Sequence, residues 1–79
     1  MKYVYMINSE SYPDRFYTGT TVDLKRRLAD HNAGISAHTK KFISWRLVTY
    51  VAFSDYRKAN EFELYLKTAS GRNFAKRHF

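Results

Sequence analysis

The run from Lys2 to Ser9 constrains the fold more than any other stretch of this 79-residue chain. Residues 3–7 within it are rich in the β-branched and aromatic types that favour strands. A half-exposed strand alternates between apolar and polar residues, whereas this run is apolar at both odd and even positions. The pattern therefore predicts a strand that is covered on both faces.

A second strand, joined to the first as a hairpin, is expected next. Residues 10–14 contain serine and proline and have the composition of a turn, and strand character resumes over residues 15–18. A hairpin centred near Ser11 would place Tyr5 roughly opposite Tyr17, with their Cβ atoms about 4.5–5.5 Å apart. The two tyrosines are therefore predicted to lie close together.

A helix is predicted over residues 22–32. Gly19 is expected to end the second strand, and Thr20 and Asp23 have the spacing of a capping box. Gly34 suits the position just beyond a helix end. These signals bracket a helix of about three turns.

The periodicity of this helix separates two adjacent arginines. At 100° per residue, Leu24 and Leu28 form the inner face, and Arg27 and His31 lie one turn apart along its edge. Arg26 points in nearly the opposite direction. We therefore expect Arg27 to face the hairpin and Arg26 to face solvent.

The C-terminal half predicts one more strand and two more helices. Residues 33–44 have no clear period and are expected to form a basic loop with room for a short helical turn. Residues 45–53 carry the longest strand signal and would complete a three-stranded sheet. Asp55, or the serine before it, can cap a helix that ends near Ala69, where a Ser-Gly pair would break it. Residues 73–79 would then form a short terminal helix docked by its phenylalanines.

One acidic residue lies on the apolar face of the second predicted helix. Ala59, Phe62 and Leu66 make the buried face, and Glu63 falls among them, whereas Glu61 projects outward. An unpaired carboxylate on an apolar surface is costly. Glu63 is therefore a candidate for a functional role.

The charge of the chain favours a polyanionic partner. Fourteen Lys and Arg against seven Asp and Glu leave a formal charge of +7. Nucleic acid is the leading partner on this ground, and an inert basic surface is the alternative. An acidic membrane surface is disfavoured, because the basic residues are dispersed and do not form one strongly amphipathic helix.

Composition and spacing also exclude several classes of site. Without cysteine, no disulfide framework or thiolate zinc site can form, and the three histidines lack the spacing of a helical zinc motif. The three glycines are too scattered for a phosphate-binding loop. No apolar stretch approaches the roughly 20 residues of a membrane span, and the N-terminus lacks a signal-peptide pattern. A cytoplasmic protein is therefore expected.

In their order and spacing, the short motifs of the chain resemble those of the GIY-YIG nucleases. The chain looks most like the small single-domain members, and it is similar to the N-terminal catalytic domain of the excision-repair endonuclease. Residues 1–79 are accordingly expected to form one such domain. The resemblance covers nearly the whole chain and rests on Tyr3-Val4-Tyr5, Tyr17-Thr18-Gly19, Asp23-Leu24-Lys25-Arg26-Arg27, His31, Glu63 and Lys67.

This resemblance implies a fold, an activity and a set of roles. The implied fold is α+β, with a three-stranded antiparallel sheet flanked by helices. The implied activity is hydrolysis of DNA phosphodiesters, in repair or recombination, with one divalent metal, Mg²⁺ or Mn²⁺. Tyr17 would act as general base or its relay with support from Tyr5, Arg27 would contact the phosphate, His31 would assist, and Glu63 would hold the metal.

The chain departs from the family pattern at several positions. Tyr3 replaces the glycine of the first motif, Val4 and Thr18 replace isoleucines, and Thr20 stands where some relatives place lysine. The hydrophobic exchanges are mild. Some relatives also use a downstream asparagine, for which Asn73 is a loose candidate.

Five further residues are candidates for contacts with the DNA backbone. In the basic loop, His38 and its neighbour Thr39 either touch the DNA or are solvated. The five candidates are Arg26, His38, Lys40, Lys41 and Lys67.

Each candidate catalytic residue also has a purely structural explanation. Tyr5 and Tyr17 could be an aromatic cross-strand pair, Arg27 could lie along apolar surface, and His31 could be hydrogen-bonded. Glu63 could pair with the lysine four residues later. The alternatives to a nuclease are a nucleic-acid-binding module with little or no hydrolysis and a structural domain with a basic surface. A targeting protein partner, the oligomeric state and the preferred DNA stay open.

Overall fold

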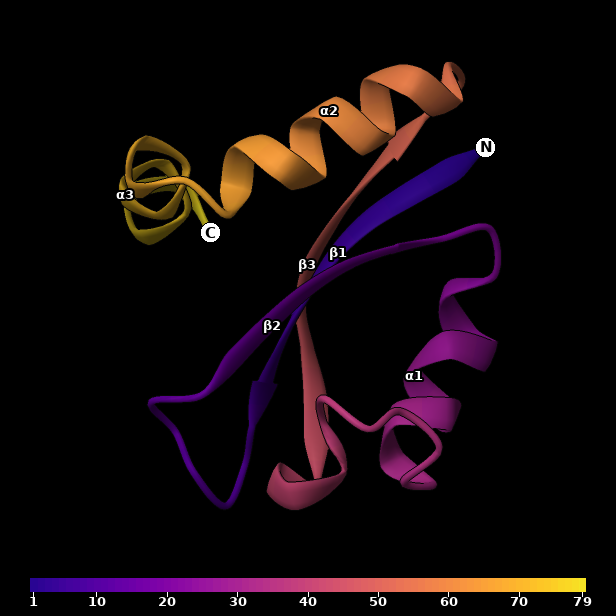
Figure 1. The fold of residues 1–79 in the computed structure, drawn as a ribbon, viewed down its shortest axis with the longest axis vertical. Coiled ribbons are helices and arrows are strands. Elements are labelled where there is room, and N and C mark those ends of the chain that lie inside the picture. The colour runs from indigo at the N-terminus through magenta and orange to yellow at the C-terminus, as the bar shows by residue number, and fades with distance from the viewer.

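The computed structural model describes all 79 residues and has an α+β fold, as predicted. Figure 1 shows a sheet of three strands with three α-helices packed around it. No helix is both long and apolar enough to cross a bilayer. The elements follow in the order β1 (Lys2–Ser9), β2 (Phe16–Thr21), α1 (Leu24–Asn32), a 3-10 turn (Lys40–Phe42), β3 (Trp45–Phe53), α2 (Tyr56–Leu66) and α3 (Ala69–His78).

Strand β1 lies in the centre of the sheet, between β2 and β3, and is antiparallel to both. Helix α1 covers one face, while α2 and α3 lie toward the other (Figure 1). Tyr5 and Ile7 pack with Trp45 under α1, whereas Val4 packs with Leu66 and the rest of the α2–α3 cluster. The prediction of a strand covered on both faces is confirmed.

The predicted register of the hairpin is wrong by two residues. Tyr5 pairs with Gly19, and Tyr17 pairs with Ile7. The connecting loop is longer than expected because the side-chain amide of Asn8 donates to two of its carbonyls, at 2.9 and 3.0 Å. A shift by two positions keeps side chains on the same face of a strand. The two tyrosines therefore still share one face, as diagonal neighbours.

The start of α1 also differs from the expectation. Strand β2 continues two residues beyond Gly19, so this glycine does not end it. The cap is Asp23 alone, whose carboxylate accepts the N–H of Arg26 at 3.1 Å, and Thr20 takes no part. At the other end, Gly34 lies beyond the helix with φ +77, as its predicted stop position requires.

The break between the two C-terminal helices lies earlier than predicted. Helix α2 starts after the expected Asp55 cap but ends at Leu66, and Thr68 caps α3 by accepting the N–H of Gly71 at 3.1 Å. The Ser-Gly pair expected to break the helix is thus inside the first turn of α3. Gly71 is needed there because a Cβ atom would lie 1.8 Å from a carbonyl oxygen in the last turn of α2. Helix α3 is docked by Phe74, as expected.

Replacing Gly71 with alanine should destabilise the protein. The added methyl group meets main-chain atoms that cannot move aside independently, so we expect the free energy of unfolding to fall by about 1–3 kcal/mol. Chemical denaturation measures this change. Ser70→Ala, at an exposed position in the same turn, is the matched control and should change stability by less than about 0.5 kcal/mol. Equal stability of the two variants would contradict the close approach of α2 and α3.

Candidate active site

Three of the predicted site residues bring their rings together under α1. Tyr5 comes from β1, Tyr17 from β2 and His31 from the last turn of α1. The ring centroids of Tyr17 and His31 are 5.1 Å apart, those of Tyr5 and His31 5.8 Å, and those of the two tyrosines 6.4 Å. The sheet register and the helix face thus place these three side chains in one cluster.

A chain of buried hydrogen bonds holds His31 in this cluster. Its Nε2 lies 2.7 Å from the Tyr5 hydroxyl, and its Nδ1 lies 2.7 Å from Oγ1 of Thr39. Tyr5 is 2% exposed, and His31 and Thr39 are fully buried. The indole of Trp45 donates to the main-chain oxygen of Thr39 at 2.9 Å, which fixes the loop behind the histidine.

The tautomer of His31 sets the direction of both hydrogen bonds, because each ring nitrogen faces one hydroxyl. A proton on Nε2 makes His31 the donor to Tyr5 and Thr39 the donor to Nδ1, whereas a proton on Nδ1 reverses both. We adopt the first tautomer as a prediction, in which the phenolic proton of Tyr5 points away from the histidine.

The charge states of Tyr5 and His31 follow from burial. Burial raises the pKa of Tyr5 and outweighs the lowering by Arg27, and Tyr17 and Glu63 raise it further. Burial also lowers the pKa of His31, helped by the positive charge of Arg27 and opposed by the nearby Asp30 carboxylate. At neutral pH both groups are therefore uncharged.

Arg27 supplies the positive charge of the cluster. Its guanidinium is half-buried beside the Tyr5 hydroxyl. Burial alone would lower the pKa of Arg27, but Tyr5, Tyr17 and Asp30 together raise it above its ordinary value. Arg26 is exposed on the other side of α1, so the periodicity separates the two arginines correctly.

Gly19 makes room for the phenol of Tyr5. A Cβ atom at this position would lie 2.6 Å from the Tyr5 hydroxyl oxygen and 3.0 Å from the ring of Tyr17. The sequence interpretation of Gly19 as the end of a strand missed this contact. The correct register of the hairpin would have revealed this contact, because it places Gly19 directly opposite Tyr5.

Glu63 approaches from the other side of the sheet. It is on α2, its side chain is 17% exposed, and it forms an ion pair with Lys67. The structural alternative of an i,i+4 pair is therefore present, although the carboxylate also raises the pKa of Tyr5 and so lies within electrostatic reach of the cluster.

The donor set around Glu63 limits the kind of metal it can hold. No group of three or more His, Cys, Asp or Glu side chains is arranged to bind a metal ion. Mg²⁺ commonly keeps several waters and binds through one or two carboxylates plus substrate phosphate. A single, partly exposed carboxylate fits that mode and does not fit a metal cage built by the protein alone.

The predicted DNA contacts are exposed, with one exception. Thr39 is fully buried beneath His31, so neither alternative for this residue, contact with the DNA backbone or exposure to solvent, is met. The loop folds this hydroxyl inward because it is the partner of Nδ1. The exposed side chains are Arg26, His38, Lys40, Lys41 and Lys67, with Asn73 also exposed on α3.

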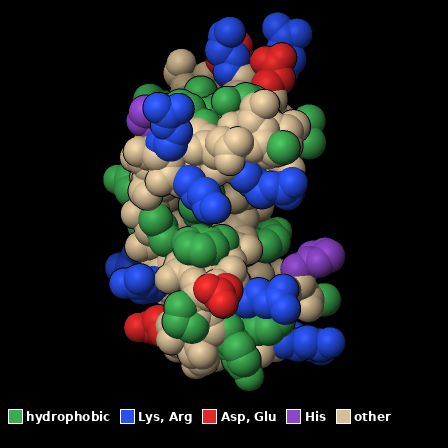
Figure 2. All heavy atoms as spheres, turned by 90° about the vertical axis from the view of Figure 1, so that its left-hand side faces the viewer, with side chains coloured by type: hydrophobic (Ala, Val, Ile, Leu, Met, Phe, Trp, Pro, Cys, Tyr) green, Lys and Arg blue, Asp and Glu red, His purple; other side chains and the backbone are tan.

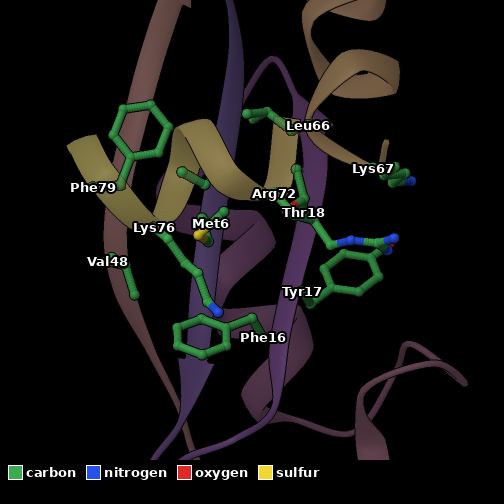
Figure 3. A pocket seen from close by; sticks show the side chains of 11 residues that line it. Met6, Phe16, Tyr17, Thr18, Val48, Leu66, Lys67, Arg72, Lys76 and Phe79 are labelled. Carbon is green, nitrogen blue, oxygen red and sulfur yellow. The ribbon is translucent and has the colours of Figure 1, made fainter. Parts of the chain in front are cut away.

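Tyr17 also borders a hollow that the sequence analysis did not predict. The hollow has a volume of about 570 Å³ and lies between the sheet and α3 (Figure 3). Phe16, Arg72, Lys76 and Phe79 line it, and of these the sequence analysis considered only Phe79, as a docking residue of the terminal helix. Arg72, Lys76 and Phe79 recur at helical spacing, but Phe16 is too far away in the chain for a local pattern to connect it with them.

The tautomer of His31 can be read directly from its side-chain nitrogen chemical shifts. In the wild-type protein we expect Nε2 to carry the proton. Thr39→Val removes the donor to Nδ1 and leaves this buried nitrogen unsatisfied, which should cost about 1–3 kcal/mol of stability. Thr39→Ser keeps the hydroxyl and should keep the tautomer. A proton on Nδ1 in the wild type would contradict the assignment.

Stability should also fall in mild acid because of His31. Its folded-state pKa lies below the value of about 6.5 of an unfolded histidine, so the unfolded chain takes up the proton more readily. The contribution of neutral His31 is therefore complete above about pH 6.5 and is lost as the pH falls through the folded-state pKa. Denaturation midpoints between pH 7.5 and 5, as test conditions, measure the loss. The loss should be smaller in His31→Gln and unchanged in the exposed control His38→Gln.

Comparison with known proteins identifies the family of this chain. A model of the GIY-YIG catalytic domain matches residues 1–77. UPF0213 proteins of Streptococcus pyogenes serotypes M3 and M1 are 37% identical over 73 residues, which cover 91% of this chain and 79% of theirs. The solution structure of the UPF0213 protein BH0048 from Bacillus halodurans is 31% identical, with a TM-score of 0.57 over 96% of this chain and 81% of that one. With its own fold and motifs in agreement, the chain belongs to the GIY-YIG catalytic domain family.

Proposed function

We propose that this protein is a metal-dependent endonuclease that hydrolyses phosphodiester bonds of DNA, with DNA repair or recombination as its setting. The observation that carries the proposal is the cluster of Tyr5, Tyr17 and Arg27 beside His31, with the carboxylate of Glu63 in electrostatic reach. Family membership and a formal charge of +7 support the same reading.

Arg27 is assigned to the phosphate. Hydrolysis gathers negative charge on the phosphate oxygens in the transition state, and a preorganised cation in a site shielded from water stabilises that charge. Arg27 is half-buried, and its raised pKa keeps it charged. Its guanidinium can offer two parallel hydrogen bonds to a phosphate, which a lysine cannot.

Tyr17 is assigned to the attacking water, as general base or as a relay to it. A water that attacks a phosphodiester must give up a proton, and the phenol oxygen of Tyr17 can accept or relay it in the field of a nearby positive charge. Arg27 lies within electrostatic reach of Tyr17. Neutral His31 donates to the oxygen of Tyr5, so that Tyr5 can direct its own proton toward the substrate or toward Tyr17.

Glu63 is assigned to the divalent metal, Mg²⁺ or Mn²⁺, which would supply positive charge at the phosphate when bound. One carboxylate of the protein suits this role if the remaining ligands are water and phosphate oxygens. Lys67 must leave Glu63, at least in part, for this to occur. Its side chain is half exposed and can turn to the DNA backbone instead.

We assign the exposed basic residues to contacts with backbone phosphates of the DNA outside the reaction site. Each phosphate contact releases condensed counterions, so affinity should fall steeply with added salt. The residues in this group are Arg26, His38, Lys40, Lys41 and Lys67.

The two adjacent arginines provide a matched test. With supercoiled plasmid and Mg²⁺ or Mn²⁺, Arg27→Ala should slow nicking roughly 100-fold or more, because it removes charge stabilisation in the transition state. Arg26→Ala removes the same charge from the exposed side of α1 and should lower DNA affinity with little effect on the maximal rate. Glu63→Gln should abolish nicking at any metal concentration.

Two outcomes would contradict the proposal. Equal nicking by Glu63→Gln and the wild type would indicate a contaminating nuclease. Salt-sensitive DNA binding without nicking, for supercoiled, branched and single-stranded DNA alike, would indicate a nucleic-acid-binding module of the same fold.

A further inference from the structure

The hollow beside Tyr17 lies over a part of the sheet that α3 leaves uncovered. Met6, Phe16, Thr18 and Val48 form its floor on the three strands (Figure 3). Its volume of about 570 Å³ falls within the range of small-ligand sites, about 300–1,000 Å³.

Three apolar side chains of this hollow lie outside the core clusters, whereas Met6, Leu66 and Ala75 belong to or pack on the α2–α3 cluster. Phe16 is 58% exposed, and Val48 and Phe79 are each 38% exposed. None of the three belongs to either core cluster of the protein. These three side chains gather around one hollow and are therefore available to a ligand.

The rim of the hollow is positively charged. Lys67, Arg72 and Lys76 line it, and no acidic residue is among its eleven lining residues. Figure 2 shows the molecule from the side on which α3 lies; there, blue Lys and Arg side chains lie above and beside exposed green hydrophobic ones, and red Asp or Glu side chains lie below them. A ligand that fits must therefore combine a flat or apolar body with negative charge.

The hollow is continuous with the candidate active site. Tyr17 lines it and also lies 5.1 Å from His31 between ring centroids. Lys67, the partner of Glu63, lines it too. Tyr17 and Lys67 thus belong to both the hollow and the surroundings of the candidate site.

We propose that the hollow binds an unstacked base of single-stranded DNA, and that this protein therefore acts on single strands or frayed ends in preference to intact duplex. This inference rests on the proposed function and names its substrate class. Sites for single strands combine a basic groove along the backbone with aromatic side chains on which bases stack. Phe16 and Phe79 supply the aromatic surface, and the cations of the rim face the phosphates.

Charge argues against the other occupants of such a surface. Two copies of this chain that met through the hollow would bring their Lys67, Arg72 and Lys76 side chains together. Like charges that are buried against one another repel strongly. An acidic amphipathic peptide has the right charge, but the contact of the hollow with Tyr17, a residue of the candidate nuclease site, favours a nucleic acid.

The test is a binding measurement that needs no catalysis. In a Glu63→Gln background with EDTA, fluorescence anisotropy compares a single-stranded oligonucleotide with a duplex of the same length. We expect the single strand to bind more tightly and the fluorescence of a 2-aminopurine within it to be quenched on binding. Phe16→Ala should weaken single-strand binding roughly 5-fold to 100-fold, the effect of losing one base–aromatic stack, and should remove the quenching.

Control variants separate stacking from general effects. Tyr56→Ala removes an aromatic ring of similar exposure, 49%, from the start of α2 and should change neither affinity nor quenching. Phe79→Ala is a second test of the hollow. Thermal melting verifies that each variant is folded, which is expected because Phe16 and Phe79 are outside the core clusters.

Failure of this inference is distinguishable from failure of the proposed function. The inference is overturned if Phe16→Ala binds single strands as tightly as Tyr56→Ala does, or if the duplex binds as tightly as the single strand. Metal-dependent nicking by the wild type would in that case leave the nuclease proposal intact. Dimerisation in sedimentation that Phe16→Ala abolishes would overturn it in favour of a second copy. If neither form of DNA binds, both proposals fail.

Discussion

The hydrogen bond between Tyr5 and His31 joins the fold of this protein to its candidate site. Tyr5 belongs to the central strand and His31 to the last turn of α1, and each is among the largest fully buried side chains. The same bond that docks the helix on the sheet also sets the orientation of the phenol. Arg27, one helical turn before His31, is positioned by the same docking. Structure and chemistry therefore depend on a single contact.

This arrangement makes part of the core polar. Thr39 completes the chain of hydrogen bonds from behind, and Trp45 fixes the loop that carries Thr39. A buried polar network is favourable only when every member has a partner, and no buried side-chain polar atom in this protein lacks one. Any placement of α1 that moved His31 away from Tyr5 and Thr39 would leave its two buried ring nitrogens without these partners, a cost that an apolar side chain would not incur.

The sequence predicted what local patterns determine. The strands Lys2–Ser9 and Trp45–Phe53 have their predicted bounds because long runs of β-branched and aromatic residues leave little choice. The helical period distinguished Arg26 from Arg27 because it depends only on the positions of residues within one helix. The errors concern contacts between distant segments. The hairpin register depends on the amide of Asn8 reaching across its loop, and the inward turn of Thr39 depends on a histidine eight residues earlier. The hollow, likewise, exists only once α3 has docked beside the sheet.

The position of β2 at the edge of the sheet limits where strands or modules can be added to a domain of this kind. Arg27 lies on α1, Glu63 on α2 and Tyr17 on the edge strand β2. Another strand paired with β2 would cover the edge beside Tyr17, whereas β3 leaves its outer edge available on the opposite side. Insertions and appended modules that pair with β3 would leave the candidate site open. The width of the sheet on the β2 side is thus constrained by the candidate site as well as by the architecture.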